Sequence, residues 1–204
     1  MKKYLMEFFR DIHVRIMSVL VLVGIVFIFR DLNAWETWLA IVIGMASYTL
    51  GEYLTHRFLF HMKPPKSELM LKFIKRIHYD HHVDPRNLKL LFLPVWYSLP
   101  NIIIFSLIVF LIIQNITLTI AFAIGISIFL LYYEWTHYIA HKEYIPKTPW
   151  GKRMKKIHLW HHYKNENYWY GVTSPTFDKV FGTYKNQHEV EKSETARNLE
   201  KRAN

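Results

Sequence analysis

Ten of the twelve histidines in this 204-residue chain lie in four short clusters. The clusters have the patterns H-x4-H, H-x2-H-H, H-x3-H and H-x2-H-H, with the members His56, His61, His78, His81, His82, His137, His141, His158, His161 and His162. Neutral imidazole is a common ligand of zinc, iron, copper and nickel. Because ten imidazoles exceed what one ion can bind, we interpret the clusters as ligands of two metal ions. His13 and His188 lie outside the clusters and are interpreted as ordinary core or surface residues.

The spacing inside each cluster has a geometric meaning on a helix. Residues three or four apart share one face, so His78 faces the same way as His81 and His82. Adjacent members of such a triplet point about 100° apart, and we therefore expect each triplet to contribute to both metals. His56 and His61 would diverge by about 140° on an ideal helix. That pair requires a helix end, a bulge or a turn between its two rings.

A site built from histidine alone favours redox chemistry over hydrolysis. A hydrolytic zinc site typically needs three protein ligands and an activated water, so ten histidines are far more than hydrolysis requires. Two redox-active metals beside a bilayer suit the oxidation of an unactivated C–H bond of a lipid. That step requires dioxygen and indicates iron, although histidine sites also bind zinc, and the isolated protein could carry zinc.

The elements that must position these rings are apolar helices. The segment from Leu90 to Tyr133 contains no Asp, Glu, Lys or Arg. A membrane span needs roughly 20 apolar residues, so this segment has room for two helices with Gln114 and Asn115 as the turn. Two shorter apolar segments, Ile16–Phe29 and Thr37–Gly51, predict a second hairpin. The predicted fold is an all-α membrane protein with four transmembrane helices in two hairpins and a cytoplasmic helical cap that holds the dimetal centre.

The placement of the basic residues predicts the orientation. The formal net charge is +10, and with four spans every Lys and Arg except Arg30 lies on one side of the bilayer. The positive-inside rule assigns that side to the cytoplasm, together with both termini and the metal site. We expect an integral, multi-pass protein of a bacterial cell membrane. Contact with anionic lipid explains the charge better than nucleic-acid binding, for which the chain has no recognised motif.

The chain is expected to form one membrane-embedded domain over residues 1–190. Residues 191–204 are charged and lack apolar periodicity, which predicts a disordered tail. The basic and apolar N-terminal segment is expected to be retained, because no small-x-small cleavage site follows it. The absence of Cys excludes a disulfide scaffold, a cysteine zinc finger and an iron–sulfur cluster.

Two sequences after the last cluster complete a recognisable pattern: N-Y-W-Y-G-V-T-S-P at 167–175 and F-D-K-V-F-G-T-Y at 177–184. With the four histidine motifs, they resemble the fatty acid hydroxylase and sterol desaturase superfamily of membrane non-haem dimetal oxidases. Glu52 and Tyr53 ahead of His56, and the Gly-Val-Thr-Ser run, are similar to the fatty acid 2-hydroxylase branch in particular. The resemblance covers roughly residues 44–184.

The resemblance implies an oxidoreductase that hydroxylates C2 of an acyl chain, either free or in a ceramide-like lipid. As a monooxygenase it would place one oxygen atom in the product and the other in water, with the ten motif histidines binding two metals. Relatives often carry a fused cytochrome b5 domain, for which this sequence leaves no room. A separate electron donor is therefore expected, either a ferredoxin or a cytochrome with its reductase. The sequence carries no signal for an oligomeric state.

Three carboxylates are candidates for supporting the metal ligands. Glu52 lies four residues before His56, Glu134 lies three before His137, and Asp80 lies inside the second cluster. A ligating histidine usually donates its second N–H to a carboxylate or a carbonyl, so we expect these residues behind the rings.

Two alternatives remain open at this point. Within the same superfamily, the protein could be a carotenoid hydroxylase or a sterol methyl oxidase or desaturase. Carotenoid hydroxylases tend to lack the Gly-Val-Thr-Ser run and the segment that follows it, which argues against the first. From another class, it could be a non-catalytic membrane metal-binding or carrier protein. A carrier would place its ligands near mid-bilayer, whereas these clusters follow the spans.

Overall fold

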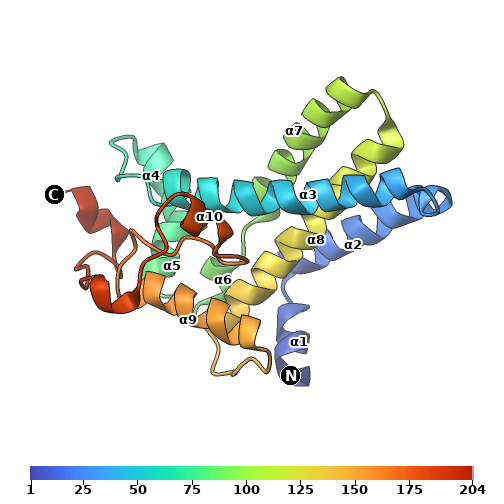
Figure 1. Cartoon of the computed structure of the whole chain (residues 1–204). Coiled ribbons are helices and arrows are strands. Elements are labelled where there is room, and N and C mark those ends of the chain that lie inside the picture. The colour runs from blue at the N-terminus through green and yellow to red at the C-terminus, as the bar shows by residue number, and fades with distance from the viewer. Residues whose placement is uncertain (204) are drawn as a thin grey trace. The chain divides into compact units, whose positions relative to one another are not determined.

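The computed structural model describes residues 1–203, and within that range every regular element is a helix and no strand occurs (Figure 1). The chain divides into two compact units, and α3 and α8 each continue from one into the other. Unit 1 comprises Met1–Thr49 and Leu93–Glu134, and unit 2 comprises Leu50–Phe92 and the described residues from Trp135 onward.

Unit 1 is built from apolar helices. Its elements are α1 (Lys2–Phe8), α2 (Ile12–Phe27), η1 (Phe29–Asp31), most of α3 (Trp35–Leu54), α7 (Val95–Ile113) and most of α8 (Ile116–Ala140). The segment Leu88–Ile113, which contains α7, and α8 are each long and apolar enough to cross a membrane. The apolar helix α2 is shorter, at 16 residues. Two such spans are therefore found where the sequence predicts four.

The turn between α7 and α8 lies where the sequence predicts it. Gln114 adopts the left-handed conformation with φ 49°, and its N–H donates to the carbonyl of Phe110. Asn115 then caps α8, since its Oδ1 accepts from the N–H of Leu118 at 3.0 Å. These two polar residues end one apolar helix and begin the next, which confirms the predicted hairpin.

The outer surface of unit 1 is unusually apolar for a protein in water. On α7, Ile104, Leu111 and Ile112 are 56%, 63% and 74% exposed. The shorter helix α2 likewise exposes Val26 and Phe27. Contiguous apolar surface of this kind marks contact with lipid or with another protein. The composition and the exposure together are consistent with membrane association.

Two glycines allow α3 and α8 to pack closely inside unit 1. A Cβ atom on Gly44 would lie 2.2 Å from the carbonyl oxygen of Phe122, and one on Gly125 would lie 2.1 Å from that of Ile41. Small residues at such crossings let helix backbones approach each other, as they commonly do in membranes. Any larger residue at either position would force the two helices apart.

Unit 2 contains shorter helices and all ten clustered histidines. Its elements are the end of α3, η2 (Thr55–Phe60), α4 (Glu68–Ile74), η3 (Lys75–Tyr79), α5 (Asp80–Val83), α6 (Leu88–Leu91), the end of α8, α9 (Pro149–Tyr163), α10 (Thr176–Val180), η4 (Gln187–Glu189) and η5 (Leu199–Ala203). Thr148 caps α9 by accepting from the N–H of Gly151 at 3.1 Å, and Pro149 occupies the first helical position.

The end of the chain differs from the predicted disordered tail. We name residues 193–202 the C-terminal strap, because they lie against the rest of unit 2 and hydrogen-bond to it. Leu199 is fully buried and Ala196 nearly so, and Ser193 donates its N–H to the carbonyl of Lys164 at 2.7 Å. Sequence composition missed this order because the strap is held by backbone groups and arginines, and needs no apolar repeat.

Candidate metal centre

The structure brings the ten clustered histidines together in unit 2 as two buried groups of five. In each group the ligand atoms lie within 4.8 Å of one another. Group A consists of His56, His61, His78, His82 and His161. Group B consists of His81, His137, His141, His158 and His162. The predicted convergence of the four clusters is confirmed.

Each triplet divides between the two groups. His78 and His82 belong to group A, whereas His81 belongs to group B. In the second triplet, His161 belongs to group A, whereas His158 and His162 belong to group B. This division follows from the angle of about 100° between adjacent residues on a helix. It is the arrangement that the sequence predicts for two neighbouring ions.

A local change of helix type aligns His56 with His61. The element η2 is a π-helix, and the N–H of His61 donates to the carbonyl of His56 at 3.1 Å, five residues back. The wider turn brings residues five apart onto one face, where an α-helix would separate them. Short π segments are frequent at functional sites, and of the three possibilities that the spacing leaves open, a helix end, a bulge or a turn, the structure contains the bulge.

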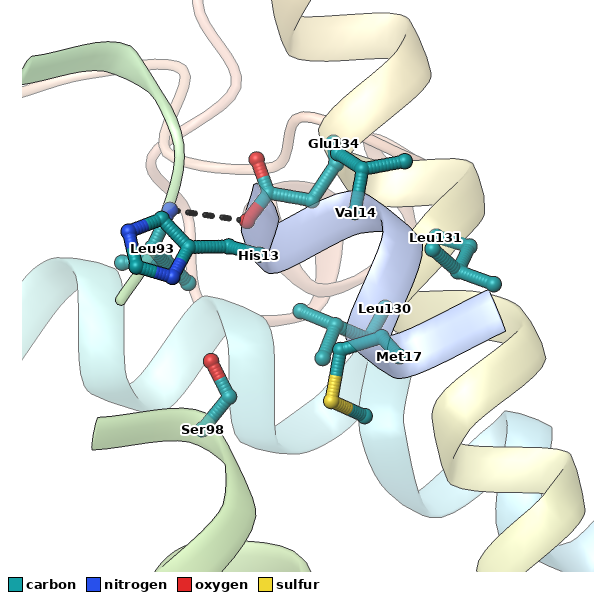
Figure 2. A pocket seen from close by; sticks show the side chains of 8 residues that line it. All are labelled: His13, Val14, Met17, Leu93, Ser98, Leu130, Leu131 and Glu134. Atoms are coloured by element: carbon teal, nitrogen blue, oxygen red, sulfur yellow. Dashed lines mark hydrogen bonds between the residues drawn. The ribbon is translucent and has the colours of Figure 1, made fainter. Parts of the chain in front are cut away.

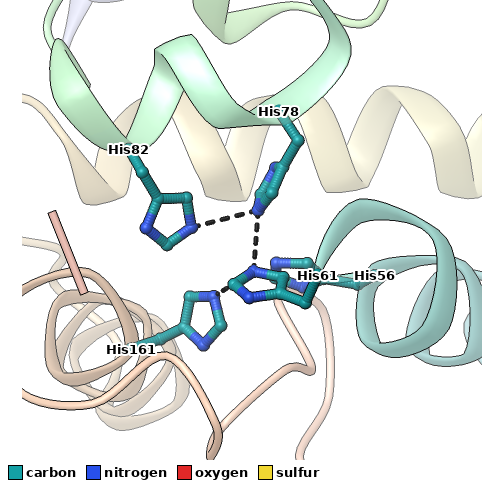
Figure 3. A group of neighbouring side chains, drawn as sticks. All are labelled: His56, His61, His78, His82 and His161. Carbon is teal, nitrogen blue, oxygen red and sulfur yellow. Dashed lines mark hydrogen bonds between the residues drawn. The ribbon is translucent and has the colours of Figure 1, made fainter. Parts of the chain in front are cut away.

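The imidazole nitrogens of group A converge (Figure 3). The Nε2 atom of His61 lies 2.8 Å from that of His78 and 3.0 Å from that of His161. His78 Nε2 lies 3.0 Å from His82 Nε2. Two nitrogen ligands bound at about 2.1 Å and at right angles lie about 3.0 Å apart. The donor set and its spacing therefore fit one metal ion.

Group B has the same spacing. The Nε2 atoms of His81 and His137 lie 2.8 Å apart, and those of His141 and His158 lie 2.9 Å apart. Both ring nitrogens of His162 are buried, with no hydrogen-bond partner among residues 1–203. A buried polar atom without a partner is costly, and a bound cation would satisfy it. Group B therefore also fits a metal ion.

Burial keeps these rings in the protonation state that binds metal. Burial and the neighbouring imidazoles hold the pKa of His61 well below its usual value. Burial also lowers the pKa of His82 to about 3. A neutral imidazole offers a lone pair to a metal, whereas an imidazolium offers none. The rings are therefore ready to ligate at neutral pH.

Backbone carbonyls orient three rings of group A. In each case the Nδ1 atom lies at hydrogen-bond distance from a main-chain oxygen, which assigns the proton to Nδ1 and leaves Nε2 to face the group. The pairs are His56 with Tyr170 at 2.5 Å, His161 with Tyr168 at 2.7 Å, and His82 with Ala196 at 2.7 Å.

Trp169 turns the loop so that the carbonyls on both sides of it reach these rings. Its φ is 60°, a left-handed conformation that is uncommon for a bulky residue. The side chain is fully buried, and its Nε1–H donates to the carbonyl of Lys185 at 3.0 Å. Its N–H donates to the carbonyl of Thr183 at 3.1 Å. Strained backbone of this kind persists where the surroundings hold it in place.

Glu52 supports the site through this loop. Its carboxylate accepts from the N–H of Val172 at 2.6 Å and from the N–H and hydroxyl of Thr173 at 3.0 and 2.5 Å. It thus holds the chain just beyond Tyr170, whose carbonyl orients His56. The sequence suggests a direct bond from Glu52 to a histidine, and the structure replaces it with this indirect support.

Asp178 holds the same loop from the other side. Its two oxygens accept from the N–H groups of Tyr170 and Gly171, both at 2.8 Å. A side chain at Gly171 would lie 2.0 Å from the carbonyl oxygen of Ser174, so the turn requires glycine there. Asp178 therefore pins the C-terminal loop beside group A.

Asp80 has other surroundings than those expected, and Glu134 has a hydrogen-bond partner within unit 1. Asp80 lies at the surface, where its side chain is 39% exposed and pairs with Lys75 at 3.7 Å. Glu134 belongs to unit 1, where it accepts from the N–H of Leu93 at 2.9 Å and lines a small cavity with His13 (Figure 2). The expected support of His137 by Glu134 stays a prediction.

Lys155 is a supporting residue that sequence reasoning missed. From α9 it donates to the carbonyls of Ile139 at 3.1 Å, Tyr144 at 2.9 Å and Lys142. These carbonyls lie at and just beyond the end of α8, next to His141. A cation at a helix C-terminus is favourable, and this one also joins two helices that carry group B. No motif in the sequence marks it.

Comparisons with known proteins agree with this geometry. A family model described as fatty acid hydroxylase matches residues 41–183. A fatty acid 2-hydroxylase of Rattus norvegicus is 36% identical over 146 residues, which cover 70% of this chain and 38% of the relative. A dihydroceramide fatty acyl 2-hydroxylase of Arabidopsis thaliana is 37% identical over 157 residues, or 76% of this chain and 64% of the relative.

A solved structure is also similar. Full-length scs7p, of which only the hydroxylase domain is visible, superimposes with a TM-score of 0.75 and 28% sequence identity. The match covers 88% of this chain and 66% of that one. The chain spans 38% and 64% of the length of the two curated relatives, less than two thirds of either.

Proposed function

Because this chain belongs to the fatty acid hydroxylase family, we propose that it is a membrane dimetal oxygenase that hydroxylates a lipid acyl chain at C2. The observation that carries the proposal is the convergence of ten buried histidines into two groups of five. The names of the relatives support the position of attack, since they are a fatty acid 2-hydroxylase and a dihydroceramide fatty acyl 2-hydroxylase.

Groups A and B each hold one metal ion in this proposal, and we take the working ion to be iron. When bound, iron supplies the dioxygen and one-electron chemistry that no protein side chain provides. The chain contributes neutral imidazoles at fixed positions and excludes bulk water by burying all ten rings. The Tyr170 ring packs against group A, with centroids 5.3 Å from His61 and 5.4 Å from His161.

The reaction converts an acyl CH₂ group, dioxygen, two electrons and two protons into a CHOH group and water. We propose that the lipid, either a free fatty acid or a ceramide-like lipid, comes from the bilayer. The apolar helices of unit 1 anchor the protein there, with four spans and with both termini and the metal site on the cytoplasmic side. Positioning of the chain relative to the metals selects the carbon that is oxidised.

Electrons come from an external donor in this proposal, a ferredoxin or a cytochrome with its reductase. The helix α9, which carries three of the metal-site histidines, exposes Lys152, Arg153 and Lys156 on its surface. An acidic donor would be attracted to such a surface, and the attraction would weaken as salt increases.

The test is product analysis with labelled oxygen. Detergent-purified protein is loaded with ferrous iron, given a reducing system and, in separate reactions, a ceramide, a fatty acid, a sterol or a carotenoid, and exposed to ¹⁸O₂. The proposal predicts a 2-hydroxy acyl product that carries one ¹⁸O atom, and predicts none from His161→Ala. Oxygen incorporated only into sterols or carotenoids would contradict the proposed substrate. Metal binding without oxygen consumption would indicate a carrier.

A further inference from the structure

We propose that the C-terminal strap is a positioning element that secures the metal of group A and leaves that of group B largely unaffected. The inference rests on the proposed function, since it takes the two histidine groups as metal sites. The match to the family model ends at residue 183, so the strap lies beyond the segment that identifies the family.

The strap makes three hydrogen bonds to the short helix α5, two of them to His82. The carbonyl of Ala196 accepts from His82 Nδ1, which directs Nε2 into group A. Arg197 donates to the carbonyls of His82 at 3.0 Å and Val83 at 2.8 Å, at the C-terminal end of α5. The same guanidinium lies over the ring of Tyr163, 4.8 Å from its centroid. A four-residue helix has little stability of its own, so these contacts fix its end.

The strap also holds His61, on a different element. Arg202 donates to the carbonyl of His61 at 2.7 Å, just where the π-helix η2 ends. A second nitrogen of Arg202 donates to Asn167 Oδ1 at 3.2 Å. Hydrogen bonds from a charged donor are stronger than neutral ones, and the planar guanidinium can hold two partners at fixed angles. Arg202 thereby links η2 to the segment after α9.

The strap has its own buried anchor. Glu166 is fully buried, and its Oε1 accepts from Thr195 Oγ1 at 2.5 Å and lies 3.9 Å from Arg202 Nε. A buried carboxylate needs such partners, since an unpaired one is strongly unfavourable. Glu200 adds an ion pair with Lys75, at 2.5 Å. The strap is therefore fastened to η2, to η3 and α5, and to the end of α9, which together carry every ligand of group A.

Group B is secured by other means. Its ligands His137 and His141 lie at the end of α8, which Lys155 of α9 holds through three carbonyls. Loosening the strap should therefore release one ion and retain the other. His81 shares α5 with His82 but contacts group B, so a small effect on the second ion is expected.

The test compares Arg197→Ala/Arg202→Ala with Lys201→Ala, which removes an exposed charge from the same strap. Full-length protein is loaded with Co²⁺, and its loss to a chelator is followed by absorbance and by metal analysis. In the double variant we expect one of the two ions to be lost about 10- to 100-fold faster. This is the usual loss of metal affinity when a residue that hydrogen-bonds to a metal ligand is removed. Lys201→Ala should match the wild type.

The arginine substitutions are also made in two variants that each lack one metal site, which shows which of the two ions is lost. His141→Ala leaves group A as the intact site, and there the arginine substitutions should speed metal loss. His161→Ala leaves group B intact, and there they should have little effect. Equal acceleration of both ions, or of neither, would overturn the proposal. If the double variant is too unstable to purify, Arg197→Ala and Arg202→Ala are tested separately.

Hydrogen exchange of the metal-free protein gives a readout that does not depend on activity. Amides of residues 55–61 and 80–83 should exchange faster in the double variant and not in Lys201→Ala. Unchanged exchange there would overturn the strap's role. Failure of the proposed function has a different signature: wild-type protein that binds no metal, or binds two ions but forms no hydroxylated lipid, with the exchange result intact.

Discussion

The two histidine groups contain five rings each, but the chain fixes them in different ways. Four of the five group A ligands lie on or beside the short elements η2, η3 and α5, whereas four of the five group B ligands come from the ends of α8 and α9. Short helices are marginal by themselves, while α8 and α9 extend over 25 and 15 residues. Group A therefore needs support from outside its own helices.

That support is visible at the Nδ1 atoms. In group A, three rings meet carbonyls of the loop at 168–170 and of the C-terminal strap. In group B, the Nδ1 atoms of His81, His158 and His162 are buried without a hydrogen-bond partner in the described part of the chain. Group A therefore depends on loops for its geometry, whereas group B depends on the relative position of two helices.

The largest expected effect is one that both groups share. His161→Ala in group A and His158→Ala in group B should each lower product formation by about 100-fold or more, because each removes a ligand rather than an outer partner. Metal content should fall from two ions to one in either variant. Product analysis and metal analysis on the same preparation provide the check. Full activity in either variant would remove that residue from the ligand set.

The second-largest effect is expected for Glu52→Ala, which should weaken metal binding by group A. Three donors at Val172 and Thr173 lose their acceptor, and we expect a loss of about 3 kcal/mol in unfolding free energy. The loop carbonyl that orients His56 loosens as a result, so the group A ion should dissociate faster. Glu52→Gln, which keeps an acceptor, should be intermediate. Thermal unfolding and chelator kinetics measure the two effects, and faster loss from group B alone would contradict the assignment.

Lys155→Ala is the matching test for group B. It removes a cation from three carbonyls at and beyond the end of α8, and should cost about 1–2 kcal/mol, since the lysine is partly exposed. We expect the group B ion to be lost about tenfold faster, with group A little changed. If Lys155→Ala instead released the group A ion, the two groups would not be secured independently.

The smallest effect is expected at Asp80. Its ion pair with Lys75 is at the surface, with both side chains more than a third exposed, and such pairs contribute well below 1 kcal/mol. Asp80→Asn should therefore leave the melting temperature, metal content and product formation near wild-type values. A clear loss of metal in this variant would restore Asp80 as a partner of the neighbouring histidines.

The sequence predicts the parts of this site that depend on helical periodicity. The convergence of the ten histidines, the division of each triplet and the need for a departure from the ideal α-helix between His56 and His61 all follow from angles per residue. The turn at Gln114 follows from polar residues between two apolar segments. Each of these features is local, so the spacing of side chains is enough to reveal it.

The rest of the site depends on contacts that leave no mark in side-chain identity. The carbonyls of Tyr168, Tyr170 and Ala196 could belong to any residue, and Trp169 reveals its left-handed backbone only in three dimensions. Arg202 lies 141 positions from the residue whose carbonyl it holds. The spacing of four residues before His56 indicates Glu52 as a supporting residue, but its hydrogen bonds go to a loop more than a hundred residues away.

Anomalous diffraction at the iron edge, from crystals of the iron-loaded protein, tests the central claim most directly. We predict two peaks, one within about 2.1 Å of the nitrogens of group A and one at the same distance from those of group B. A single peak shared by the ten rings, or peaks away from both groups, would contradict the account.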